Sequence, residues 1–253
     1  EQAGAQDPAN LRTPDDGSAE VLLEHALAIR ILSFAPELPG ARDLTLRLRE
    51  LGIVAAAGHS SCEDVHVEEL AAAGLSHVIH LWSGQSTTVR KGPHRHPGLL
   101  EASLASDTLT GELIADGKHL PPTLMRLAWR CFGADRLCLV SDATSGAGLA
   151  EGERFTMGEM EYVVAEGVGM MPDRSAFAGS TTFLSEMVPL MVERVGVPLH
   201  EAVRMASLTP ARVIGADGKG SLEAGMDADL ALYDPAGFTP TRVMIGGDWL
   251  ALG

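Results

Sequence analysis

The chain is poor in basic residues, cysteine and aromatic side chains. Lys and Arg number 19 against 34 Asp and Glu, which gives a formal net charge of −15. No cluster of Lys or Arg is present that could neutralise the phosphates of a nucleic acid or the surface of an anionic membrane. We therefore expect neither as a partner, and a small-molecule ligand is favoured instead.

Only three cysteines occur, Cys62, Cys131 and Cys138, and no Cys-x-x-Cys pair joins them. Neither a disulfide framework nor a zinc knuckle is therefore indicated, and a reducing, cytoplasmic compartment is expected. No run of about 18 apolar residues and no signal peptide is found, so we expect a protein outside the membrane. The chain starts in a polar segment without an initiator Met. We expect it to be part of something longer.

What is present is a regular alternation of short β-type runs and helical patterns. The 253 residues suffice for one large α/β domain. We expect strands at residues 26–34, 53–57, 76–81, 109–115 and 136–140. We expect helices at residues 20–25, 41–51, 63–73, 98–106, 121–132, 181–194 and 199–207. Such spacing is typical of βαβ units and predicts a parallel sheet.

Four segments depart from this alternation. Residues 1–18 are interpreted as a loop or a disordered terminus, residues 83–97 as a long polar loop, and residues 153–178 as a small antiparallel excursion. The tail contains two β-type runs, at 230–234 and 241–245, and two strands alone do not make a stable sheet. We predict a catalytic domain at 1–212 and a small C-terminal β unit at 213–253 that needs further strands.

Four successive strand ends finish in reactive side chains: His59, His80, His119 and Asp142. In parallel α/β folds the carboxyl ends of the strands face the active site, so these residues are expected to converge. Neutral imidazoles bind Zn²⁺ or a similar ion, which activates water, and a neighbouring aspartate can move the proton. The pattern therefore predicts metal-assisted hydrolysis. Ordinary hydrogen-bonded residues at strand ends remain the alternative.

Six short motifs carry a resemblance to a known family. They are Gly58-His59-Ser60, His80-Leu81, residues 114–119 (IADGKH), 140–144 (VSDAT), 177–180 (FAGS) and 205–211 (MASLTPA). In this order they resemble the N-acetylglucosamine-6-phosphate deacetylases of the amidohydrolase superfamily. The segment 220–234 is similar to the C-terminal strand pair of that superfamily. The resemblance covers nearly the whole chain.

The resemblance implies a fold and a set of roles. The fold is an incomplete (β/α)₈ TIM-like barrel with a C-terminal strand pair from a small β-sandwich. His59 and His80 match the metal ligands of one divalent ion, for which Zn²⁺ is expected. Asp142 matches the general base, and His119 a histidine that contacts the substrate. Arg95 matches an arginine that contacts the sugar phosphate, a role that suits the fork of a guanidinium; a solvated loop charge is the alternative.

This chain also departs from the family pattern. The metal-binding glutamate of a Glu-Gly-Pro motif is expected before Glu1, and Glu1 itself is not assigned that role. Gln6 stands where some members carry a substrate-binding histidine. Ser83 and Gly84 stand where the family has residues that hold the phosphate.

The resemblance implies an amino-sugar phosphate as substrate and a possible homodimer. Two alternatives stay open. One is a metal-dependent amidohydrolase for another N-acyl or cyclic amide substrate. The other is an inactive fragment that lacks the glutamate, binds metal weakly and, with an open barrel, is poorly stable.

Overall fold

A five-stranded parallel sheet forms the centre of the computed structural model, which describes residues 2–251. The sheet order is β1-β2-β3-β6-β7, and every neighbouring pair is parallel. The strands span Ile31–Phe34, Val54–Ala57, Leu75–Val78, Thr110–Ile114 and Leu137–Val140. Their short apolar runs are buried because helices cover the sheet, as parallel sheets require. The expected α/β class is confirmed.

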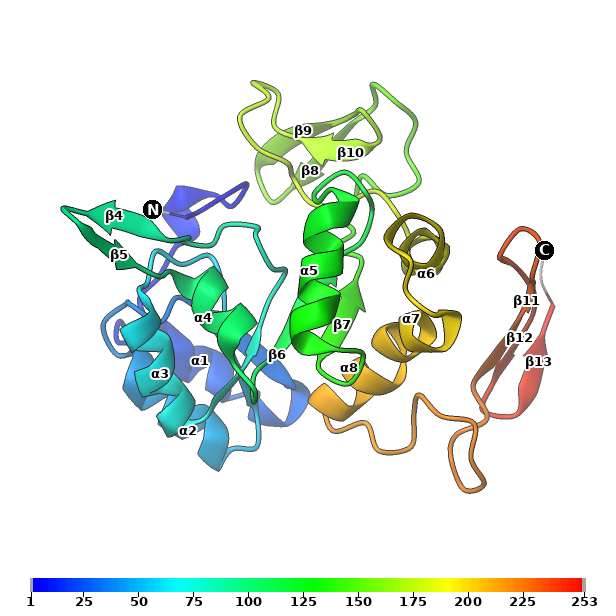
Figure 1. Ribbon diagram of the computed structural model, residues 1–253, viewed down its shortest axis with the longest axis horizontal. Helices are drawn as coiled ribbons and strands as arrows, with labels where there is room; N and C mark the ends of the chain where they lie inside the picture. Colours follow the sequence, from blue (N-terminus) through cyan, green and yellow to red (C-terminus); the bar gives the residue numbers. More distant parts are fainter. Residues whose placement is uncertain (1, 252–253) are drawn as a thin grey trace.

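Helices follow the strands and pack their apolar sides on the sheet (Figure 1). They are α2 (Ala41–Glu50), α3 (Asp64–Ala73), α4 (Leu99–Ala105), α5 (Pro122–Phe132), α6 (Leu184–Leu190), α7 (Leu199–Ala206) and α8 (Leu208–Val213), with α1 (Ser18–Leu23) before the first strand. Leu48 and Met125 are fully buried against the sheet. Within the described residues the five strands form an open sheet and not a closed barrel, as expected for an incomplete barrel.

One expected element differs from the structure near the beginning of the chain. Residues Ala26–Ala28 form a 3₁₀ turn (η2) instead of the start of a strand, because the N–H groups of Ala28 and Ile29 bond locally to the carbonyls of His25 and Ala26. A second short 3₁₀ turn, η1, spans Pro8–Asn10 within the expected N-terminal loop.

The long polar loop contains a hairpin. Its strands are β4 (Val89–Lys91) and β5 (His94–His96), and Gly92 turns the chain between them with φ +61°. The hairpin projects from the body of the molecule beside α4 (Figure 1).

The helix expected at 181–194 is also interrupted. Pro189 lies inside α6 and cannot donate a backbone hydrogen bond, and the helix continues as a π-helical turn, η3, at Met191–Val195. The sequence periodicity alone does not show this change of pitch.

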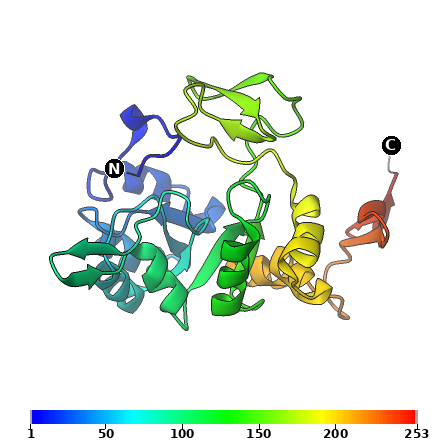
Figure 2. The same ribbon diagram turned by 45° about the horizontal axis from the view of Figure 1, so that its top comes forward.

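The antiparallel excursion is confirmed as a three-stranded sheet of β8 (Arg154–Met157), β9 (Met160–Ala165) and β10 (Val168–Met170). It lies over the carboxyl ends of the parallel strands, next to the N-terminal segment (Figures 1 and 2). Phe155, Tyr162 and Val164 form its small core, and Ala5 packs against them. The hydroxyl of Tyr162 donates to the carbonyl of Ala5 at 2.5 Å. The insertion therefore holds the N-terminal segment in place.

The tail forms three strands, β11 (Leu230–Asp234), β12 (Thr239–Ile245) and β13 (Asp248–Leu250), instead of the expected pair. The third was missed because it is short and begins directly after the turn at Gly246-Gly247. The sheet stands apart from the body in both views, and large side chains such as Leu232 and Trp249 are exposed (Figures 1 and 2). The division at residue 212 stays a prediction.

Between residues 2 and 251, none of the helices has the length and apolar character needed to span a bilayer.

Candidate active site

Four strand ends meet at one cavity of about 520 Å³. His59 follows β2, His80 follows β3, His119 lies just past β6, and Asp142 follows β7; all four line the cavity. The rings of His59 and His80 touch edge to face, with centroids 4.9 Å apart and planes at 88°. The predicted convergence of these side chains is therefore confirmed.

The backbone is strained where the site is built. His59, His80 and Asp142 have φ values of +45°, +21° and +49°. A left-handed conformation costs a residue with a side chain about 1–2 kcal/mol, so it persists only where the surroundings enforce it. Such strain clusters at functional sites, and here three of the four cavity residues named above carry it.

The two touching histidines have the hydrogen-bonding pattern of metal ligands. His59 Nδ1–H donates to the carbonyl of Gln2 at 2.7 Å, which leaves Nε2 as a lone-pair donor to a metal. His80 Nδ1 is buried and has no hydrogen-bond partner among the described residues. Burial lowers the pKa of His80, and the neighbouring His59 lowers it further. Both effects favour the neutral imidazole that binds a cation.

Two imidazoles fit a divalent ion but do not complete its coordination. From residue 2 to residue 251, no three His, Cys, Asp or Glu side chains are arranged to hold a metal. His59 and His80 are thus a partial ligand set.

His119 is held by a buried carboxylate that the family pattern did not assign. Its Nδ1–H donates to Asp116 Oδ2 at 2.7 Å, and Ser180 Oγ donates to the same oxygen at 3.0 Å. The backbone N–H groups of Lys118 and His119 donate to Oδ1, each at 2.9 Å. Burial alone would raise the pKa of Asp116, but these hydrogen bonds, led by that of His119, outweigh it and lower the pKa. His119 therefore has a fixed ring with Nε2 as its free nitrogen.

Asp142 has the character of a base. Burial raises its pKa against the opposing effect of His80 and His119, and a raised pKa makes a carboxylate a better proton acceptor near neutral pH. Its carbonyl accepts the N–H of Ser180 at 2.8 Å in a parallel bridge that continues the sheet beyond β7. At Gly179, with φ +68°, a Cβ would lie 2.7 Å from the Asp142 carbonyl oxygen. Only glycine fits there.

The structure separates the predicted substrate-binding residues into two groups. Gln6, Ser83 and Gly84 line the cavity together with His119. Arg95 does not line it, because the hairpin of β4 and β5 carries its side chain outward into solvent. There its Nη1 makes a long bond, 3.4 Å, to the carbonyl of Pro93. Arg95 is thus not brought together with the other predicted substrate-binding residues, and its contact with a phosphate stays a prediction.

Several cavity residues were not singled out from the sequence. Thr144, Met157 and Trp82 line the cavity, and Phe177 places its ring against His119 with centroids 4.9 Å apart. Trp82 also has a positive φ, +71°. The segment that holds Phe177 was recognised as a family motif, but its apolar contact with the histidine depends on tertiary packing.

Glu112 is a second residue that the sequence reasoning missed. Its carboxylate accepts the backbone N–H of His80 at 3.3 Å and contacts His77 Nε2 at 3.1 Å. His77 is 1% exposed and the side chain of Glu112 is 19% exposed, so a buried histidine is paired here with a partly buried carboxylate. A glutamate within the apolar run of residues 109–115 was the available signal, since a charge in a strand of this kind needs a partner.

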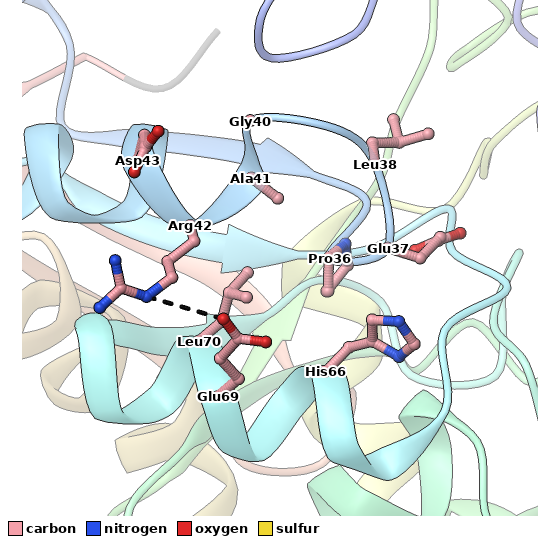
Figure 3. Close-up of a pocket in the computed structure, with 10 residues that line it drawn as sticks. All are labelled: Pro36, Glu37, Leu38, Gly40, Ala41, Arg42, Asp43, His66, Glu69 and Leu70. Atoms are coloured by element: carbon pink, nitrogen blue, oxygen red, sulfur yellow. Dashed lines mark ion pairs between the residues drawn. The ribbon is translucent and has the colours of Figure 1, made fainter.

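A second hollow of about 370 Å³ lies on the outer side of the sheet between α2 and α3 (Figure 3). Arg42 and Glu69 form an ion pair across it, with Nε and Oε1 3.6 Å apart. The strained histidines and Asp142 lie elsewhere, so we do not assign this hollow as the active site.

A parallel α/β sheet with histidines and an aspartate gathered at its carboxyl edge is an architecture of the amidohydrolase type. Residues 64–250 match the family model described as "Amidohydrolase family", and the chain belongs to that family. It is 33% identical over 248 residues to an N-acetylgalactosamine-6-phosphate deacetylase of Escherichia coli O157:H7, covering 96% of this chain and 63% of that protein. It is 35% identical over 200 residues to an N-acetylglucosamine-6-phosphate deacetylase of Vibrio furnissii, covering 79% of this chain and 48% of that protein.

Solved structures agree with this placement. The N-acetyl-D-glucosamine-6-phosphate deacetylase of Mycobacterium smegmatis, in a mutant form with N-acetyl-D-glucosamine-6-phosphate, superposes with a TM-score of 0.90 at 30% identity, covering 98% of this chain and 65% of that one. The enzyme of Thermotoga maritima gives 0.87 at 29%, covering 98% and 65%. The family resemblance is therefore confirmed, and the chain spans less than two thirds of the length of these relatives.

Proposed function

We propose that the protein is a metal-dependent deacetylase that converts N-acetylglucosamine 6-phosphate into glucosamine 6-phosphate and acetate. The observation that carries this proposal is the meeting of His59, His80, His119 and Asp142 at one cavity. The similarity to deacetylases of amino-sugar phosphates supports the substrate class. A cytoplasmic location remains a prediction.

In the proposed reaction, His59 and His80 would hold one divalent ion, with Zn²⁺ expected. A glutamate before Glu1 would complete the ligand set. When bound, the ion would act as a Lewis acid and make water a nucleophile at neutral pH.

Asp142 accepts a proton from the water as the water oxygen bonds to the carbonyl carbon of the acetyl group. It then returns that proton to the nitrogen as the C–N bond breaks. His119, fixed by Asp116, contacts the substrate carbonyl through Nε2.

Two amino-sugar phosphates are candidate substrates. Relatives are named for N-acetylglucosamine 6-phosphate and for N-acetylgalactosamine 6-phosphate, and this chain resembles both. We assign substrate contacts to Gln6, Ser83 and Gly84. Arg95 keeps a phosphate-binding role only if its hairpin, or that of a second copy in a homodimer, reaches a cavity. A substrate without phosphate, or another N-acyl or cyclic amide, is the alternative that the exposed Arg95 favours.

Acetate release tests the proposal in the protein extended upstream to the length of its relatives. Both sugar phosphates, their forms without phosphate and a cyclic amide form the panel. Asp142→Asn is expected to lower kcat by about 10²–10⁴-fold, the usual contribution of a general base. Asp173→Asn, at an exposed turn of the insertion, serves as the matched control. Equal rates for Asp142→Asn and the unchanged protein would remove Asp142 from the mechanism.

An inactive fragment is the second candidate, and the partial ligand set of the described residues favours it for this chain. Two protein ligands bind zinc much more weakly than three. After dialysis against micromolar Zn²⁺, the 253-residue chain is expected to retain less than one zinc ion per molecule. The extended protein is expected to retain one zinc ion per molecule. Stoichiometric zinc in the shorter chain would contradict the need for the upstream glutamate.

A further inference from the structure

Glu37 bonds to the two residues that follow His59 and does not line the cavity itself. It follows β1 in the segment Ala35-Pro36-Glu37, and its two carboxylate oxygens accept two separate hydrogen bonds. Ser60 Oγ–H donates to Oε2 at 2.6 Å, and the backbone N–H of Ser61 donates to Oε1 at 2.6 Å. Both donors come directly after His59 in the chain. Hydrogen bonds to an ionised carboxylate are the stronger kind, so this clamp fixes the chain just beyond the histidine.

Ser60 connects Glu37 to the wall of the cavity. It is fully buried; its N–H donates to the carbonyl of Gly84 at 2.9 Å, and its carbonyl accepts the N–H of Ser86 at 2.9 Å. Gly84 in turn lies against the His59 ring, because a Cβ at this glycine would come within 2.8 Å of His59 Nδ1. The ring is thus enclosed by a segment whose position depends on Ser60.

His59 needs such support because its φ of +45° is unfavourable for a histidine. A strained backbone persists only where its neighbours prevent relaxation. The bonds to Glu37 restrain the two residues that would have to move first. Glu37 itself lies on the outer hollow, where Figure 3 shows its side chain turned away from the pair formed by Arg42 and Glu69.

We propose that Glu37 is a positioning residue, which acts through Ser60 and Ser61 to hold the His59 imidazole in its metal-binding orientation. The proposal rests on the proposed function, since it takes His59 as a metal ligand. It predicts that a residue outside the cavity controls the geometry inside it.

The same hollow supplies a matched control. Glu69 is also an acidic residue of its lining, but its described ion pair is with Arg42, which lies on the surface. Glu37→Ala and Glu69→Ala therefore remove the same charge from the same hollow. Only Glu37→Ala breaks a connection to His59. Glu37→Gln keeps the size and one acceptor oxygen, so it should act as a partial rescue.

The experiment uses the 253-residue chain without metal for the spectra, and the protein extended upstream, with Co²⁺ as the probe, for the metal affinity. Long-range ¹H–¹⁵N spectra report the imidazole of His59, assigned with His59→Gln. In Glu37→Ala the His59 signals are expected to move or broaden, in Glu37→Gln to change less, and in Glu69→Ala to stay in place. Cobalt affinity is expected to fall about 10–100-fold in Glu37→Ala, the usual effect of losing a residue that orients a metal ligand.

Unchanged His59 signals and unchanged cobalt affinity in Glu37→Ala would overturn the proposal. If that variant does not fold, Glu37→Gln and Ser60→Ala replace it. Their effects on the His59 signals should then be less than additive, because they break the same contact, and full additivity would refute the link. If His59 moves in Glu37→Ala while the protein extended upstream takes up no cobalt, the positioning role stands and the metal assignment fails.

Discussion

Replacing Asp116 should destabilise the protein strongly and alter the tautomer of His119. The carboxylate is buried and accepts four hydrogen bonds, two from backbone N–H groups, one from the His119 ring and one from the Ser180 hydroxyl. In Asp116→Ala at least the ring and the hydroxyl lose their acceptor while they remain buried. Each orphaned donor costs about 1–3 kcal/mol, so we expect a loss of about 3 kcal/mol or more in the free energy of unfolding.

Asp116→Asn separates charge from shape. The amide oxygen can still accept the two backbone N–H groups, but the amide nitrogen faces Ser180 and His119 as a donor. The His119 ring must then accept at Nδ1 and carry its proton on Nε2, while the Ser180 hydroxyl loses its acceptor. We expect a loss of about 1–2 kcal/mol, smaller than for alanine. Urea unfolding at pH 7 followed by circular dichroism measures both values, and ¹⁵N shifts of the ring report the tautomer.

The difference in the free energy of unfolding between the unchanged protein and Asp116→Asn should become smaller at low pH. The pKa of Asp116 is lowered in the folded state, so its contribution is fully present above the unfolded value of about 3.9. It is lost as the pH falls through the lower folded value. A stability gap that stays constant from pH 7 to below pH 3 would refute this reasoning, as would an alanine variant within 0.5 kcal/mol of the unchanged protein.

Three further experiments test separate parts of the structure. Gly179→Ala places a Cβ 2.4 Å from Thr144 Cγ2 at a positive φ, so we expect a melting temperature lower by several degrees and a displaced Asp142, visible in its carboxyl NMR shift. Tyr162→Phe removes the hydroxyl that donates to Ala5; faster amide exchange in residues 2–6 with little change elsewhere is expected, and unchanged exchange would contradict the anchoring role of the insertion. Burial raises the pKa of Cys62 to about 11 and of Cys138 to about 12, so a thiol reagent at pH 8 should label half-buried Cys131 first, by peptide mass analysis.

The positions of the catalytic candidates could be predicted because the signal for them is local. Short apolar runs mark the strands, and the first polar residue after each run marks its end, as at His59 after residues 53–57. The parallel sheet then brings these ends to one edge without further information. Ser83 and Gly84 were assigned to the substrate by the family resemblance, and both line the cavity.

The supporting groups could not be predicted, because their partners lie far away in the sequence. Glu37 bonds to a serine 23 residues later, and Glu112 to the backbone of a histidine 32 residues earlier. A positive φ at a histidine has no local signal, since only tertiary contacts impose it. Arg95 was placed at the substrate by family pattern, and the hairpin that directs it outward depends on pairing between residues 89 and 96.

These supports explain why two of the strained strand ends, at His59 and His80, do not relax. Glu37 bonds to the two residues after His59, and Glu112 accepts the N–H of His80. A hydrogen bond to a charged group contributes about 1.5–3 kcal/mol, which matches or exceeds the 1–2 kcal/mol cost of a left-handed residue. The strain at His59 and His80 is therefore offset locally by hydrogen bonds to Glu37 and Glu112. It follows that the contact between the His59 and His80 rings should already exist in the metal-free protein, so that an arriving cation meets oriented ligands.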